Sequence, residues 1–307
     1  KALGLSRDYA DVIDLLVVGN EVLLRGELPP AELAGLLARA RRESAVPVAY
    51  ADVWEFWVRH ADALRPHVDV VAAHVLPYWE DEPVAIEQAV LHVAAVNAKI
   101  RAFFAPLPVF IAETGWPAAG RQRGAAVPGR LEQARFIREL LAGQDGALHY
   151  NLIEGFDQPW KRQLEGAMGG YWGLFAADGT QRVSLNGPVA ADPVWWRLPL
   201  GALIGGAAGL LWGLGGGMWR GPKSASTRKP HGRAATAALI LAGAGLVPLG
   251  ILQGQMLLQW SRSPLDWTFG AGVALSAGLC ALLAAGRLAR VFDGWIPPEN
   301  RPGLMAV

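Results

Sequence analysis

Short apolar runs rich in β-branched residues recur along the first part of the chain, with longer amphipathic segments between them. The five runs cover residues 12–19, 46–51, 68–75, 107–112 and 148–153. Runs of this length and composition are typical of strands buried on both faces of a parallel sheet. The segments 30–42, 85–103 and 131–141 show apolar residues at helical spacing, so we expect crossover helices there. The pattern predicts an α/β fold made of repeated βα units.

Every predicted strand ends in polar and aromatic residues. In a (β/α)8 TIM barrel the carboxyl ends of all strands form one active face, whereas a doubly wound sheet gathers its functional residues at one switch point. Five such ends therefore favour the barrel. Because a barrel typically needs about 250 residues, we expect roughly three strands upstream of Lys1. The residues that close the five runs are Asn20 and Glu21, Asp52 and Trp54, Tyr78 and Trp79, Glu113 and Trp116, and Glu154, Asp157 and Trp160.

The hydrophobic pattern changes after residue 193. Three uncharged stretches follow, at residues 198–219, 234–261 and 267–286, and each is long enough to cross about 30 Å of hydrocarbon as a helix. A buried hairpin of soluble core helices is the alternative, but such helices are seldom this long without a charge. We expect a partial barrel over residues 1–193 and a membrane region with three transmembrane helices over residues 194–307.

Charge also separates these two parts. Residues 1–193 carry 18 basic and 24 acidic residues, whereas residues 194–307 carry 10 and 3. Basic loops stay on the cytoplasmic side of a membrane, so the link between the first two spans predicts that residues 1–193 lie outside the cytoplasm. The predicted spans on both sides of this link explain its basic charge better than nucleic-acid binding does, and we expect no nucleic-acid partner. The basic residues of the link are Arg220, Lys223, Arg228, Lys229 and Arg233.

Cysteine and histidine give no sign of a metal or cofactor. The single cysteine, Cys280, falls within the third predicted span, so an intramolecular disulfide or a thiolate metal site is excluded. The six histidines show no spacing typical of metal ligands. We expect no cofactor and no catalytic metal.

Two glutamates stand out because each one closes a continuous apolar run, Glu21 in VVGNEV and Glu113 in VFIAETGWP. Cleavage of a glycosidic bond needs one carboxyl group that protonates the leaving oxygen and another that attacks or activates water. Taken alone, either glutamate is better explained by helix capping or by an ion pair at the rim. Together, on strands three apart in order, they are candidates for a catalytic pair facing across a barrel mouth.

The segments GNEV and IAETGWP resemble the two active-site segments of glycoside hydrolase family 17. Three more segments, HVLPYWE at 74–80, YNLIEGFDQPWK at 150–161 and GGYWGLF at 169–175, are similar to the bacterial, membrane-anchored branch of that family. The likeness covers residues 1 to about 190. It implies that Glu21 is the general acid/base on the fourth barrel strand and Glu113 the nucleophile on the seventh. Members of that branch are described as β-1,3/β-1,6-glucan synthases or endo-1,3-β-glucanases.

Other residues near the same strand ends are expected to bind the sugar chain. Flat aromatic faces suit pyranose rings, although thirteen tryptophans mean that many belong to the core or the interface. By the resemblance, Asn20 would hold the sugar 2-hydroxyl. Plant relatives carry a hydroxyl residue and a glutamate where this chain has Ala118 and Gln158, which leaves the linkage specificity open. The remaining candidates are Asp52, His74, Tyr78, Trp79, Trp116, Glu154, Trp160 and Lys161.

These inferences together predict a retaining glycoside hydrolase or transglycosylase that acts on β-1,3-linked glucans, with or without β-1,6 branches, through a covalent glycosyl-enzyme. It would work on the periplasmic face of the bacterial inner membrane, with the lipid bilayer and a glucan synthase as candidate partners. One alternative is a non-catalytic glucan-binding or sensing module of a membrane glucan-synthesis system. Another is a transporter or synthase subunit whose tail conducts glucan, although few polar groups lie in the spans.

Overall fold

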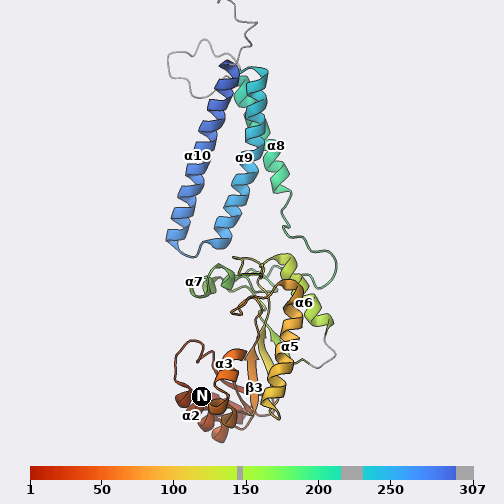
Figure 1. The fold of residues 1–307 in the computed structure, drawn as a ribbon, viewed down its shortest axis with the longest axis vertical. Coiled ribbons are helices and arrows are strands. Elements are labelled where there is room, and N and C mark those ends of the chain that lie inside the picture. Colours follow the sequence, from red (N-terminus) through yellow and green to blue (C-terminus); the bar gives the residue numbers. More distant parts are fainter. Residues whose placement is uncertain (144–147, 216–230, 295–307) are drawn as a thin grey trace, which may run out of the picture. The chain divides into compact units, whose positions relative to one another are not determined.

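A computed structural model describes residues 1–143, 148–215 and 231–294 (Figure 1). The chain forms two compact units, Lys1–Ala191 and Asp192–Val307. Most of the basic link on which the expected topology rests, including Arg220, Lys223, Arg228 and Lys229, lies outside the described residues.

The first unit is built on a parallel sheet in which all five predicted strands form. The strands follow one another across the sheet in chain order, and every neighbouring pair is parallel. The α/β class is therefore confirmed. Over the described residues the sheet is open, with its first and last strands as edges. The strands are β1 (Leu16–Asn20), β2 (Val48–Val53), β3 (Val70–His74), β4 (Val109–Thr114) and β5 (Tyr150–Leu152).

Helices occupy the segments between the strands, as the amphipathic pattern predicts. In α2, for example, Leu33, Leu37 and Ala40 are buried at helical spacing, and a proline at the first helical position suits the start of the helix. The elements are α1 (Ala2–Asp8), α2 (Pro30–Glu43), α3 (Trp54–Arg59), α4 (Ala61–Leu64), η1 (Arg65–His67), α5 (Ile86–Phe104), α6 (Arg130–Ala142), η2 (Pro159–Lys161), α7 (Arg162–Glu165) and η3 (Ala167–Gly170).

The two faces of the sheet differ in what they carry. Side chains alternate between the faces of a strand, and on β2 the face with Tyr50 packs against Trp57 of α3, with the ring centroids 5.6 Å apart. The main hydrophobic core lies on this helix-covered face. The opposite face is lined by small residues, chiefly Ala49, Ala51 and Ala72. The candidate site lies at the carboxyl ends of these strands, with His74 on the same face as Ala72.

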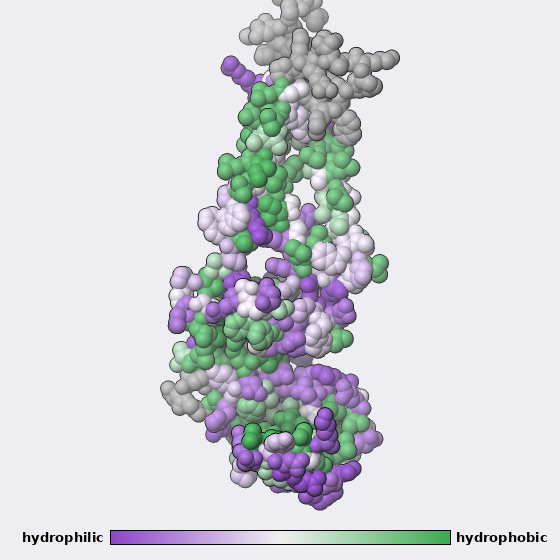
Figure 2. All heavy atoms as spheres, turned by 180° about the vertical axis from the view of Figure 1, so that it is seen from behind, coloured by the Kyte–Doolittle hydropathy of each residue, from purple (hydrophilic) through white to green (hydrophobic). Residues whose placement is uncertain are grey.

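The second unit consists of three long helices, α8 (Arg197–Gly215), α9 (Arg233–Trp260) and α10 (Pro264–Gly294). All three are long and apolar enough to cross a membrane, judged by length and composition. Hydrophobic residues cover much of their outer surface, whereas hydrophilic residues are frequent on the first unit (Figure 2). Within the described residues the helices cover the predicted spans, and α10 extends eight residues beyond the third. Residues 216–219, the end of the first predicted span, lie outside the described residues.

Candidate active site

The two candidate glutamates meet a histidine at the carboxyl ends of the strands. Glu21 directly follows β1, His74 ends β3 and Glu113 lies near the end of β4. The His74 Nδ1 atom is 3.1 Å from Glu21 Oε1 and 3.8 Å from Glu113 Oε2. This nitrogen and one oxygen of each carboxylate all lie within 4.8 Å of one another. The separation is close to the roughly 5 Å between carboxyl groups that is typical of retaining glycosidases.

An irregularity in β4 brings Glu113 to this cluster. Ala73 pairs with Ile111, but His74 pairs with Glu113, so β4 contains one extra residue at this point. Strict alternation would put Glu113 on the same, helix-covered face as Ile111. An extra residue changes that alternation, and such bulges often direct side chains at active sites. Glu113 is therefore aligned with His74, whose face is the alanine-lined one.

Glu21 is placed by its turn. Its backbone has φ 54°, a left-handed conformation that costs free energy for a residue with a side chain. The next residues are tied to β2, because the Leu23 N–H donates to Tyr50 Oη at 3.0 Å and to Asp52 Oδ2 at 3.2 Å. The Leu24 N–H also donates to Asp52, at 3.4 Å. Tyr50 and Asp52 thus hold the turn that carries Glu21.

This arrangement corrects one expectation. Asp52 was expected to bind sugar, but it is fully buried on the helix-covered face, and its carboxylate accepts the Tyr50 hydroxyl as well as backbone N–H groups. Its position follows from the alternation of β2, because Asp52 and Tyr50 are two residues apart. Asp52 therefore stabilises the turn that carries Glu21 from the helix-covered side of the sheet, and its side chain does not point into the site.

The two glutamates lie in different electrostatic surroundings. The hydrogen bond from His74 lowers the pKa of Glu21 below its ordinary value, against the effect of burial, and Arg25 at 2.9 Å adds to this. Burial raises the pKa of Glu113, with His74 opposing it and the charge of Glu21 adding to it. A general acid needs a raised pKa and a nucleophile must stay ionised. This order is opposite to the roles that the resemblance implies.

A second acidic group lies close to the pair. Lys161 Nζ is 2.8 Å from Glu154 Oε2, and the Lys161 charge also acts on Glu113 and lowers its pKa. Glu165 in α7, which the sequence reasoning missed, belongs to the same group. Burial raises its pKa, Lys161 opposes this, and the negative charges of Glu154 and the catalytic candidates add to it. The available signal was its spacing, four residues after Lys161, which puts both on one side of a helical turn.

The aromatic candidates divide into buried and exposed residues. Tyr78 and Trp116 are buried, with the Tyr78 hydroxyl donating to the Arg121 carbonyl and Trp116 Nε1 donating to the Val127 carbonyl at 3.1 Å. They belong to the core and offer no free face to a sugar ring, contrary to expectation. Thirteen tryptophans made this outcome foreseeable for some of them, but the pattern did not say which.

The other two aromatic candidates are more accessible. Trp79 is partly buried, stacks on Trp172 with centroids 6.5 Å apart, and lies under the Arg123 guanidinium at 4.9 Å. Trp160 is 59% exposed, and its Nε1 donates to Gln158 Oε1 at 2.9 Å. Trp160 is thus the aromatic candidate with an open face.

Asn20, expected at the sugar 2-hydroxyl, is exposed at the end of β1, next to Glu21.

The cluster of Glu21, His74 and Glu113 also has the donor atoms of a cation site. Sequence spacing gave no hint of this, because the three residues lie on different strands. The ion pair between Glu21 and Arg25 already supplies positive charge there, and a metal ion would compete with it.

A pair of carboxyl groups facing each other at the strand ends of a parallel α/β sheet is the arrangement used by glycoside hydrolases. Residues 2–173 match the family model of the BtgE/BtgC glycoside hydrolase domain. The match spans more than half of the chain, and the chain therefore belongs to this family. Membership of a glycoside hydrolase family, which the sequence segments predict, is confirmed at this level.

Two curated relatives are fungal proteins. The chain is 31% identical over 170 residues to the "Probable beta-glucosidase btgE" of Aspergillus fumigatus, covering 54% of this chain and 30% of that protein. It is 30% identical over 168 residues to the protein of the same name from Neosartorya fischeri, covering 53% and 30%. The chain thus spans about a third of the length of these relatives.

Solved structures show the same fold. The crystal structure of the glycoside hydrolase family 17 β-1,3-glucanosyltransferase from Rhizomucor miehei aligns with a TM-score of 0.51 at 24% identity, covering 57% of this chain and 64% of that one. An active-site mutant of that enzyme, in complex with laminaritriose, aligns equally well over 56% and 64%. That family is the one that the sequence segments resemble.

Proposed function

We propose that the chain is the catalytic part of a retaining enzyme that cuts or rejoins β-linked glucans, with Glu21 and Glu113 as its carboxyl pair. The proposal rests on one observation, the approach of these two side chains to within 4.8 Å at one rim of the sheet. Retention through a covalent glycosyl-enzyme requires a separation of this size, whereas inverting enzymes leave room for a water molecule.

The two pKa directions do not by themselves assign the roles within the pair, because the two groups are coupled. Carboxyl groups this close titrate as a pair and not as two independent acids. His74 is within reach of both carboxylates, so it can stabilise whichever one is ionised. We propose Glu21 as acid/base and Glu113 as nucleophile, as the resemblance implies, and the opposite pKa order makes this assignment the first thing to test.

The proposed substrate is a β-1,3-linked glucan, with or without β-1,6 branches. Support comes from the structural relative, which is a β-1,3-glucanosyltransferase and has been crystallised with laminaritriose. Trp160, Gln158 and Lys161 form an accessible polar and aromatic segment, and the Lys161 charge acts on Glu113. We propose that this segment contacts the sugar chain. Water or another sugar hydroxyl can release the glycosyl-enzyme, so both hydrolysis and transfer products are to be measured.

The test uses the complete protein with linear β-1,3-gluco-oligosaccharides, and the products are analysed by mass and linkage. Glu113→Ala should abolish cleavage and transfer. With an activated glucoside and azide, a variant that lacks the nucleophile should give the α-glucosyl azide, and one that lacks the acid/base should give the β-anomer. Unchanged turnover in Glu113→Ala would refute the enzymatic proposal and leave a glucan-binding module.

We further propose that residues 194–307 form a membrane region with three transmembrane helices. Residues 1–193 would then lie on the periplasmic side of a bacterial inner membrane, because the link after α8 is rich in lysine and arginine. A glucan synthase in the same membrane is the partner we propose, since a tethered domain would meet the polymer where it emerges.

Topology can be tested with single cysteines in a Cys280→Ala background. A membrane-impermeant maleimide applied to intact spheroplasts should label Asn186→Cys and leave Ser224→Cys unlabelled until the membrane is opened. The reverse pattern would contradict the proposed orientation.

A further inference from the structure

The three helices of the second unit do not pack equally well. A Cβ placed on Gly205 would lie 2.0 Å from the Gly243 carbonyl oxygen, so the backbones of α8 and α9 are in direct contact there. By contrast, α10 is buried against the other helices mainly near its end, where Ala285 and Ala289 meet α9. Most of its apolar side chains, such as Leu275, are exposed.

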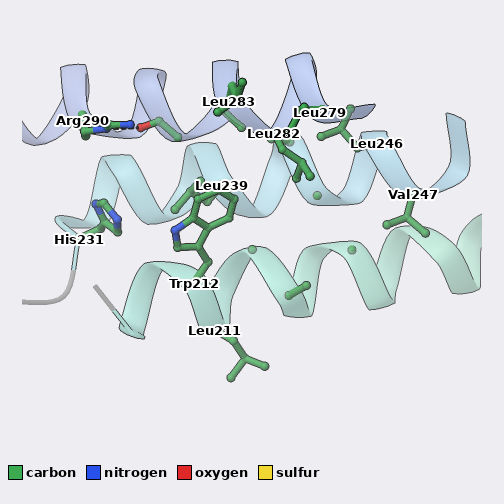
Figure 3. A pocket seen from close by; sticks show the side chains of 17 residues that line it. Leu211, Trp212, His231, Leu239, Leu246, Val247, Leu279, Leu282, Leu283 and Arg290 are labelled. Carbon is green, nitrogen blue, oxygen red and sulfur yellow. Dashed lines mark hydrogen bonds between the residues drawn. The ribbon is translucent and has the colours of Figure 1, made fainter. Parts of the chain in front are cut away.

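This unequal packing leaves a cavity of about 800 Å³ between α10 and the α8–α9 pair. Figure 3 shows its walls, which are apolar along most of their length and come from all three helices. A cavity of this size falls within the range of ligand-binding pockets. In a membrane, an apolar space that opens between helices is accessible to lipid chains. Apolar lining residues include Leu246, Val247, Leu279, Leu282 and Leu283.

Polar groups line only one end of the cavity. His231, just before α9, and Arg290, near the end of α10, lie at this end together with Trp212 (Figure 3). The His231 ring is paired with the Asp293 carboxylate. Arg290 donates its Nε–H to the Gly286 carbonyl at 3.2 Å, and it forms no ion pair with any residue in the described part of the chain. The end of the cavity thus presents one positive charge that lacks an acidic partner there.

We propose that this cavity is a binding site for an anionic phospholipid, with an acyl chain along the leucine-lined wall and the phosphate at Arg290. Arginine binds phosphate strongly through parallel N–H groups, and basic pockets between transmembrane helices are known to hold anionic headgroups. Arg290 lies four residues before the end of α10, which puts its charge near headgroup depth. The proposal rests on the proposed membrane location of the tail and is independent of the glucan chemistry.

The test compares lipids retained by the complete protein. The protein is reconstituted in nanodiscs that contain equal amounts of phosphatidylglycerol and phosphatidylcholine, and retained lipid is counted by native mass spectrometry. The wild-type protein should keep one phosphatidylglycerol per chain. Arg290→Gln should weaken this retention about fivefold, the loss expected for one basic contact. Arg287→Gln is the matched control, because Arg287 lies on the same helix but does not line the cavity.

A second pair of variants tests the apolar wall without changing any charge. Ala208 lines the cavity from α8, whereas its exposed neighbour Ala207 does not. Ala208→Phe should displace the acyl chain and reduce retention, while Ala207→Phe should retain the lipid.

Three results would overturn the proposal. The first is equal retention of both lipids by the wild-type protein, and the second is an equal loss in Arg290→Gln and Arg287→Gln. The third is a lipid-free dimer, in which a second copy of the chain covers the cavity. Resistance of the wild-type protein to carbonate extraction from membranes is measured in parallel. Failure there would contradict the membrane location itself, and so would be distinguishable from failure of the lipid site.

Discussion

The ends of β1 and β4 hold the same kind of side chain in different ways. Glu21 sits in a left-handed turn that is fixed by Tyr50 and Asp52 of the neighbouring strand. Glu113 is brought into line by an extra residue in its own strand. The position of Glu21 therefore depends on other side chains, whereas that of Glu113 depends mainly on its own backbone. The difference shows which substitutions should disturb one carboxylate and spare the other.

Removing either carboxylate should have the largest effect. We expect Glu21→Gln and Glu113→Gln each to lower kcat for β-1,3-gluco-oligosaccharides about 10³-fold, since each provides a step that the other cannot supply. Steady-state product analysis measures this, and circular dichroism verifies the fold. A large loss in only one of the two variants would mean that the other glutamate is not part of a catalytic pair.

Substitution of Asp52 should disturb Glu21 alone. Asp52→Asn weakens the bonds to the Leu23 and Leu24 N–H groups, and a displacement of about 1 Å in a catalytic group can cost about 10² in rate. We expect kcat to fall by that order with little change in KM. Tyr50→Phe, which keeps the ring and removes the hydroxyl, should give a smaller loss.

A double-mutant cycle provides the control for Asp52. In a Glu21→Gln background, Asp52→Asn should cause almost no further loss, because its effect passes through Glu21. Full additivity of the two losses would show that Asp52 acts on the protein in some other way.

Trp160 should affect substrate binding more than chemistry. Its exposed ring adjoins Lys161, whose charge acts on Glu113, so Trp160→Ala should raise KM up to about tenfold through lost stacking while kcat stays within about twofold. Product analysis over a series of chain lengths checks this, with the exposed Leu164→Ala as a control. Equal effects from both variants would remove Trp160 from the proposed sugar contact.

The smallest effect concerns stability against pH, and its sign differs between the two glutamates. The lowered pKa of Glu21 contributes stability above the unfolded-state pKa, and this is lost as pH falls through the folded value. The raised pKa of Glu113 has the opposite effect, because stability is lost as pH rises from the unfolded value through the folded one. At neutral pH, Glu21→Gln should therefore unfold at lower denaturant concentration than wild type, and Glu113→Gln at higher. If both variants moved the denaturation midpoint in the same direction, the opposite pKa shifts of Glu21 and Glu113 would be contradicted.

The sequence predicted the elements and pointed to the two glutamates that meet at the strand ends, whose catalytic role stays a prediction, but it did not predict the direction of several side chains. Strands buried on both faces lack hydrophobic alternation, so nothing in VAYADV indicated that the face shared by Tyr50 and Asp52 is the one covered by helices. The extra residue in β4 could likewise not be predicted, because VFIA reads as one continuous apolar run that Glu113 closes. Glu165 lies in a short helix after an irregular segment, where periodicity gives little information.

The contact between Gly205 and Gly243 restricts how this tail can vary. A side chain at either position would collide with the backbone carbonyl of the other helix. Replacing a neighbouring side chain with a smaller one would therefore not make room for it. Any larger residue would push the two helices apart along their length. Natural variants of the tail should therefore change freely on their outward-facing leucines and keep these two positions as glycine.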